Sequence, residues 1–327
     1  MIRTVFIWGP LLRRCVKIVS NMKLIFSTVQ SPRAREHGFT FIELLVVLAV
    51  VALLAVTLFP ALANTQPNSR AFQCLNNQRQ IMLAWRMYGE DNNDLLPPND
   101  YVSSTWFSTS SPNWVAIPGF ESGFGTDDLS LLTNRNSLLS AYIHAGATYH
   151  CPADGYIDPQ RRMANARSVS MNSAVGTIWV SSSFPSGLPL GAAVPGDQLN
   201  GPYPFGSTPS LLWLTYGKFS SIVRPSPANL FVIMDENPYL IDDGTIAIVA
   251  AASAGKTYLI DFPGGNHDGA GGIAFADGHS IIHKWRDVRT YGPQGIKIPG
   301  QGSSPSDPQS PDNPDCFYLA SITSALG

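Results

Sequence analysis

Residues 35–63 read REHGFTFIELLVVLAVVALLAVTLFPALA, and from Phe39 onward this stretch is an almost unbroken apolar run. Among its last 25 residues only Thr40, Glu43 and Thr57 are polar. About 20 apolar residues are enough for a helix to cross a bilayer. The run therefore predicts a transmembrane helix at residues 39–63.

The segment before this run is basic. Residues 1–38 carry seven lysines and arginines against a single acid, Glu36. Positive charge beside a membrane span is retained on the cytoplasmic side. We therefore expect a cytoplasmic N-terminus, a single pass through the membrane, and a C-terminal part outside the cytoplasm. The leader of 38 residues is long, and translation from Met22 instead of Met1 would give a leader of ordinary size.

Glu43 is the unusual residue of the run. A carboxylate inside an apolar helix costs about 2.5–3.5 kcal/mol on insertion scales, so such a residue is expected to have a partner and a role. The plainer alternative is a side chain near the membrane edge that reaches back to the interface.

The order of residues around Gly38 resembles the signature of type IV prepilins, in which a glycine precedes Phe-Thr and a glutamate is the fifth residue of the mature chain. The resemblance implies that a prepilin peptidase cuts between Gly38 and Phe39 and methylates the new amine. It also implies that Glu43 assists assembly by pairing with the Phe39 amine of a neighbouring subunit. Opposite charges brought together in an apolar setting offset each other's burial.

An ordinary signal peptide is the competing interpretation. Ala61-Leu62-Ala63 has the A-x-A pattern of a signal-peptidase site, and cleavage there would release a chain beginning at Asn64. The apolar run is longer than the 7–15 residues usual for a signal peptide, and Glu43 would interrupt it without purpose.

Composition indicates one exported domain beyond the span. The chain has 327 residues, of which 44% are hydrophobic and 13% charged, with a net charge of -2, so nucleic acid is not expected as a partner. We expect a removed leader at 1–38, a span at 39–63, a globular domain at 64–298, and a flexible tail rich in Pro, Gly and Ser at 299–327.

Periodicity predicts an α+β domain. Residues 68–89 read as a helix whose buried face includes Cys74, Ile81, Trp85 and Tyr88. Strands are expected at 169–180, 230–235 and 245–252, and Asp277-Gly278 is expected to form a type I′ hairpin turn between 272 and 285. The resemblance implies a pilin-like fold, in which one long N-terminal helix packs on an antiparallel sheet with large loops.

A second resemblance concerns the C-terminal half. The H-x9-D-G spacing from His267 to Asp277-Gly278 is similar to an element of a large family of bacterial prepilin-like proteins. The stretches that begin at Cys74, Cys151 and Asp235 agree with the same family. Taken alone, the element also fits a turn at Asp277-Gly278 and a histidine that caps a loop.

Acidic and histidine residues cluster in this half of the sequence and suggest a metal site. Carboxylates favour calcium, whereas imidazoles favour a transition metal. The candidate ligands are Asp235, Glu236, Asp242, Asp243, His267 and Asp277, with His279 nearby.

Four cysteines, Cys15, Cys74, Cys151 and Cys316, are present, and none forms a CxxC pair. Cys15 precedes the processing site, so at most one disulfide can form within the exported part. We expect it between Cys74 and Cys151, which lie in stretches that match the family.

The sequence contains no P-loop, HExxH, nucleophile elbow or dinucleotide fingerprint, so we do not expect an enzyme, although His267 and Asp277 leave hydrolysis as an alternative. The resemblance implies a pilin-like or pseudopilin subunit of a type II secretion or type IV pilus-like assembly. Its expected partners are a prepilin peptidase, membrane lipid, and other pilin-like subunits through residues 39–63. The alternative is an anchored extracytoplasmic binding protein that forms no filament.

Overall fold

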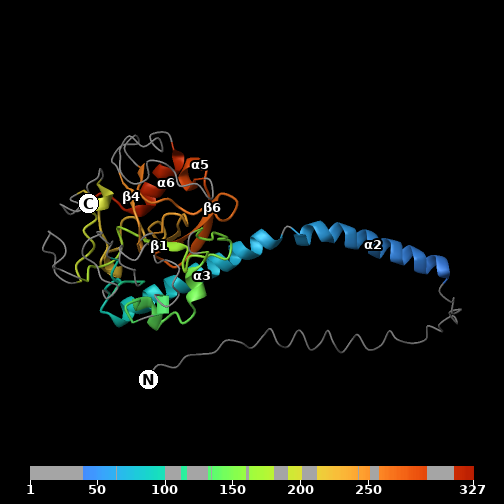
Figure 1. Ribbon diagram of the computed structural model, residues 1–327, viewed down its shortest axis with the longest axis horizontal. Helices are drawn as coiled ribbons and strands as arrows, with labels where there is room; N and C mark the ends of the chain where they lie inside the picture. The colour runs from blue at the N-terminus through green and yellow to red at the C-terminus, as the bar shows by residue number, and fades with distance from the viewer. Residues whose placement is uncertain are drawn as a thin grey trace, which may run out of the picture. The chain divides into compact units, whose positions relative to one another are not determined.

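The computed structural model describes residues 40–63, 65–99, 112–115, 132–133, 135–159, 162–179, 191–200, 212–241, 243–250, 258–292 and 313–327. The chain divides into two compact units, residues 1–61 and 62–327. Figure 1 shows the element labels used below.

The first unit contains most of helix α2, Phe41–Ala63. Large apolar side chains are exposed along this helix from Phe41 to Leu54. No helix in the described part of the chain reaches the length and apolar character needed to cross a membrane. The span expected at residues 39–63 stays a prediction.

Helix α3, Thr65–Asp91, is longer than the predicted helix at 68–89 and has the predicted buried face. Cys74, Ile81 and Trp85 are buried, while Arg79 and Arg86 are exposed. Spacings of seven and four residues place the buried side chains on one side of a helix with 3.6 residues per turn. Because the helix lies against β6, β7 and β2, this side faces the sheet.

The second unit has a five-stranded sheet in the order β3-β1-β2-β6-β7. All neighbours are antiparallel except β1 and β3, which are parallel. A separate antiparallel pair joins β4 to β5. The mixed α+β class is confirmed. The strands are β1 Val169–Asn172, β2 Phe231–Asp235, β3 Thr245–Ile246, β4 Ile248–Val249, β5 Tyr258–Leu259, β6 Ala270–Phe275 and β7 Ser280–Lys284.

Two of the expected strands are shorter than predicted. The strand expected at 169–180 ends at Asn172, because the Asn172 side chain accepts the backbone N–H of Ala174 and turns the chain. The strand expected at 245–252 is divided into β3 and β4. Apolar content alone did not show either interruption.

Each face of the sheet has its own apolar core. Ile81 and Trp85 of α3 pack with Val232 of β2 on one face. Leu319 and Ile322 belong to α6, Pro314–Thr323, and pack in the cluster on the other face. The sheet therefore lies between α3 and α6 (Figure 1).

Helix α6 corrects the C-terminal part of the tail expected at 299–327, whose residues 299–312 lie outside the described residues. Asn313 caps this helix by accepting the backbone N–H of Asp315, and Pro314 occupies the first turn, where proline is well tolerated. Cys316 and Leu319 are buried. The last described residues, 313–327, are therefore part of the domain and not a flexible tail.

Short helices connect these elements. They are η3 Leu138–Ala141, η4 Gly146–Tyr149, η5 Asp197–Leu199, η6 Phe219–Ser221 and α5 Val288–Tyr291. Helix η4 leads directly to Cys151, and α3 packs against it.

The β6-β7 hairpin forms as predicted, but its turn is of another type. A type I′ turn needs positive φ at both central residues. At Asp277-Gly278 only the glycine has positive φ, at 93°. The Gly278 N–H donates to the Phe275 carbonyl, and the Phe275 N–H donates to the His279 carbonyl. This pattern is that of a three-residue loop with glycine at its left-handed position.

Candidate functional site

The predicted processing site lies mostly outside the described residues. Gly38 and Phe39 are not described, whereas Thr40 and Glu43 are. Glu43 Oε2 accepts the Thr40 N–H at 2.8 Å and the Thr40 hydroxyl at 2.9 Å. The Glu43 N–H in turn donates to Thr40 Oγ1 at 3.3 Å. This reciprocal arrangement is a capping box, so Glu43 also stabilises the start of α2.

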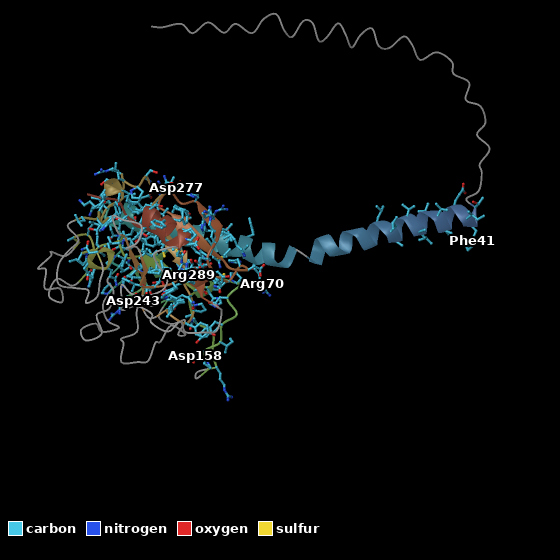
Figure 2. All side chains as sticks on the ribbon, turned by 90° about the horizontal axis from the view of Figure 1, so that it is seen from above. Phe41, Arg70, Asp158, Asp243, Asp277 and Arg289 are labelled. Atoms are coloured by element: carbon cyan, nitrogen blue, oxygen red, sulfur yellow. The ribbon has the colours of Figure 1, made fainter. Side chains whose placement is uncertain are left out.

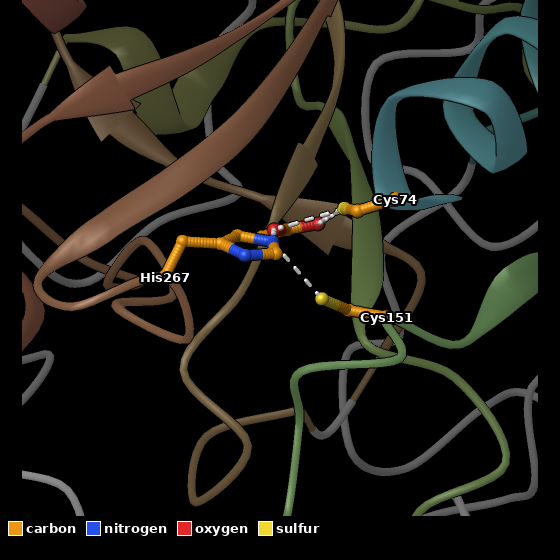
Figure 3. Close-up of side chains that lie close together, drawn as sticks. Cys74, Cys151 and His267 are labelled. Carbon is orange, nitrogen blue, oxygen red and sulfur yellow. Dashed lines mark hydrogen bonds and ion pairs between the residues drawn. The ribbon is translucent and has the colours of Figure 1, made fainter. Parts of the chain in front are cut away.

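Four potential ligands meet in the second unit: Cys74, Cys151, Asp235 and His267 (Figure 3). They come from α3, from the segment after η4, from the end of β2, and from the turn before β6. One ligand atom from each residue lies within 4.8 Å of all the others. It is the only group of three or more such side chains close enough to hold a metal among the described residues.

The contacts within this cluster are short. The Cys74 sulfur lies 3.5 Å from Asp235 Oδ2 and 3.6 Å from Oδ1. The Cys151 sulfur lies 3.3 Å from Nε2 of His267, and the same nitrogen lies 3.8 Å from Asp235 Oδ2. All four side chains therefore converge on a common centre, with His267 Nε2 facing both a sulfur and a carboxylate.

The cluster is almost sealed from solvent. Cys74, Cys151 and Asp235 are buried, and the His267 side chain is 6% exposed. Two neighbours hold the Asp235 carboxylate: Gln78 Nε2 donates to Oδ1 at 3.0 Å, and the Gly272 N–H donates to Oδ2 at 2.8 Å. Gln78 lies one turn after Cys74 on the same face of α3.

Local backbone structure places His267. The His267 N–H donates to the Ala270 carbonyl, and the Ala270 N–H donates back to the His267 carbonyl. Asp268 and Gly269, the two residues between them, both have positive φ. The type I′ geometry expected at Asp277-Gly278 is therefore found at this earlier Asp-Gly pair.

Burial and mutual proximity shift the pKa values of the cluster. The neighbouring Cys74 thiol lowers the pKa of Cys151 to about 5, and Cys151 and burial raise the pKa of Cys74. Burial, together with the charge on Cys151, raises the pKa of Asp235 to about 8. Burial lowers the pKa of His267, but its hydrogen bond with Cys151 and the nearby charges of Cys151, Asp235 and Asp268 together outweigh this, so the pKa of His267 lies above its ordinary value.

Only two of the predicted metal ligands, Asp235 and His267, belong to the cluster. Glu236 is buried next to Asp235, but its carboxylate accepts the Ser170 hydroxyl. Asp243 Oδ1 accepts the backbone N–H and the hydroxyl of Thr245.

Asp277 and Asp242 are the remaining predicted ligands. Asp277 lies in the exposed β6-β7 turn, where it contacts His279 Nδ1 at 2.6 Å. Figure 2 shows Asp243 and Asp277 well apart. Asp242 lies outside the described residues. The structure does not bring Glu236, Asp243 and Asp277 to the cluster: Glu236 and Asp243 have other partners although they are close to Asp235 in sequence, and Asp277 lies beyond the far end of β6.

Within H-x9-D-G, strand β6 explains the spacing. His267 precedes β6 and Asp277-Gly278 follows it, so the nine intervening residues contain the strand. The two ends of the element therefore lie at opposite ends of β6, with His267 in the cluster and Asp277 in the turn.

Cys74 and Cys151 were expected as a disulfide, and the structure brings them together as unbonded thiols. Sequence reasoning did not consider them as metal ligands, and it missed Gln78. The sequence did contain a signal for Cys74 and Gln78. Both lie on the predicted buried face of α3, where a polar side chain needs a partner.

Comparison with known families finds a match at the N-terminal end of the chain. The family described as "Prokaryotic N-terminal methylation motif" matches residues 33–59, which include Gly38, Phe39 and Glu43. No curated protein and no solved structure matches the chain. The matched segment supports a prepilin-like protein and, in general terms, a type IV pilin-like or pseudopilin precursor.

Proposed function

We propose that this protein is a pilin-like or pseudopilin subunit of a type II secretion or type IV pilus-like assembly in a bacterial inner membrane. A prepilin peptidase cuts it between Gly38 and Phe39 and methylates the Phe39 amine. The observation that carries the proposal is the methylation-motif match at residues 33–59. The mature subunit then associates with other subunits and with lipid through residues 39–63.

The surface of α2 supports an apolar partner for this segment. Large side chains are exposed throughout its first half: Phe41, Ile42, Leu44, Leu45, Val46, Val47, Leu48, Val50, Val51, Leu53 and Leu54. A continuous apolar surface of this kind is unfavourable in water and favours lipid or neighbouring helices. In this proposal, residues 39–63 anchor the subunit and also form its contact with other subunits.

Glu43 has two separable roles in this proposal. Within the described residues, its contacts with Thr40 use Oε2, which leaves Oε1 for the Phe39 amine of a neighbouring subunit. Glutamine preserves a capping box but carries no charge. Glu43→Gln therefore removes the intersubunit ion pair while retaining the helix start, and Thr40→Ala has the converse effect.

The first test is the mature N-terminus. The full chain is expressed in a bacterium that has a prepilin peptidase, extracted in detergent, and analysed by peptide mass spectrometry. We expect a chain that begins with N-methylated Phe39. A chain that begins at Asn64 would show an ordinary signal peptide and would refute the proposal.

The second test compares Glu43→Gln with Glu90→Gln, an exposed glutamate of α3 that serves as the matched control. Both variants should be processed at Gly38–Phe39. Cross-linking between subunits should be lost in Glu43→Gln and retained in Glu90→Gln. Processed parent protein that never cross-links to another subunit would instead indicate the alternative, an anchored extracytoplasmic binding protein.

A further inference from the structure

We propose that Cys74, Cys151, Asp235 and His267 bind one Zn²⁺ ion, which holds helix α3 to the sheet. The site differs from the predicted one, which relied on carboxylates, because half of its ligands are sulfurs. It does not depend on the processing or assembly of the chain.

The donor atoms select the class of metal. Calcium takes six to eight oxygen ligands, and this cluster offers one carboxylate. Thiolates favour soft and borderline metals, and zinc is bound by thiolate, imidazole and carboxylate in sets of four. The set of two cysteines, one histidine and one aspartate therefore fits zinc and excludes calcium.

The distances fit a tetrahedral ion. Zinc–sulfur bonds of about 2.3 Å and zinc–nitrogen or zinc–oxygen bonds of about 2.1 Å give ligand-to-ligand edges of about 3.4–3.8 Å. The cluster has edges of 3.5 Å between Cys74 and Asp235, 3.3 Å between Cys151 and His267, and 3.8 Å between His267 and Asp235. No ligand atom is farther than 4.8 Å from another, so side-chain shifts of about 1 Å would close the site.

The energetics of Asp235 also point to a cation. Its side chain is fully buried, and its only ionic contact with a described residue is His267 at 3.8 Å. A buried carboxylate without a close cation is costly. Gln78 and the Gly272 N–H orient the carboxylate, as neighbours of metal ligands commonly do.

The burial of the cluster indicates a structural ion. Catalytic zinc sites keep one position open for water or substrate, whereas structural sites have four protein ligands. Here four protein ligands are present and nearly sealed from solvent. The ligands are far apart in sequence, at positions 74, 151, 235 and 267, so one ion would connect α3 with two loops and the central strand β2.

The first experiment measures metal content in the full chain, purified in detergent under reducing conditions without chelator. Elemental analysis should find one zinc ion per chain. Cys151→Ser, Asp235→Asn and His267→Gln should each lower zinc occupancy at least tenfold under the same dialysis. The matched controls are Cys316→Ser, a buried thiol outside the cluster, and His279→Gln, an exposed histidine; both should retain zinc.

Cobalt substitution of the parent chain gives a second measurement that does not depend on whether a variant folds. Co²⁺ added to the metal-free chain should give the intense visible bands of a tetrahedral site and a near-ultraviolet sulfur-to-cobalt band. Weak octahedral bands, or no sulfur band, would overturn the proposal.

The chief rival is the disulfide. If protein isolated from the cell envelope contains no zinc and non-reducing peptide mapping finds Cys74 bonded to Cys151, the pair is a redox cross-link and the proposal is wrong. Free thiols in a chain that neither contains zinc nor takes up added Zn²⁺ would refute it equally.

Discussion

Replacement of Gly272 by alanine tests the packing between α3 and the sheet. A Cβ atom at this position would lie 2.3 Å from Gln78 Nε2 and 2.9 Å from Gln78 Cδ. Favourable contacts between heavy atoms need about 3.5–4.0 Å. Gln78 cannot easily move away, because it is buried and donates to Asp235.

The cost of Gly272→Ala follows from these contacts. If the backbone shifts, overpacking costs about 1–3 kcal/mol. If Gln78 moves instead, a hydrogen bond to a carboxylate is lost, which costs about 1.5–3 kcal/mol when that group is charged. With about 2–4 °C per kcal/mol for a domain of this size, we expect the melting temperature to fall by about 2–12 °C.

The assay is thermal unfolding of the full chain in detergent, followed by circular dichroism at a fixed zinc concentration. Gly155→Ala is the matched control, because a Cβ there would meet nothing within 4 Å, and it should not lower the melting temperature. In a Gln78→Ala background the clash is absent, so Gly272→Ala should cost much less. Equal melting of Gly272→Ala and Gly155→Ala, or an undiminished cost in the Gln78→Ala background, would refute the reasoning.

Two further predictions concern the core and pH. Trp85 is fully buried and packs on Phe219 at 4.3 Å, so Trp85→Ala should cost about 3–5 kcal/mol in chemical denaturation, whereas Leu83→Ala at an exposed position of the same helix should stay within about 0.5 kcal/mol. Equal losses would contradict the assigned face of α3. His283 stacks on Tyr318, and its burial lowers its pKa from 6.5. As the pH falls, His283 therefore takes up a proton in the unfolded chain at a higher pH than in the folded chain. The stability that neutral His283 contributes is therefore present above pH 6.5 and is lost as the pH falls through the lowered pKa of His283 in the folded chain. His283→Gln should flatten the decline in melting temperature between about pH 7 and 5, and an unchanged profile would reject this assignment.

Local sequence patterns were sufficient to predict the features that depend on residues close together in the sequence. The order of Gly38, Phe39 and Glu43 indicated a prepilin-like start, which the methylation-motif match supports. The helical spacing of Cys74, Ile81 and Trp85 predicted the buried face of α3, because periodicity records which side of a helix avoids water. Strand β2 and the β6-β7 hairpin were likewise predicted from short apolar runs and turn residues.

The candidate metal site depended on tertiary structure. Asp235 and Glu236 are adjacent in sequence, yet only Asp235 joins the cluster, because the Glu236 carboxylate accepts the Ser170 hydroxyl instead. Cys74 and Cys151 reach it from α3 and from a loop 77 residues later, across a separation that no local pattern records. Composition suggested a tail, whereas burial of Cys316 and Leu319 places α6 in the core. Sequence periodicity determined which faces are buried, and the pairing of strands far apart in the chain decided which buried polar groups meet.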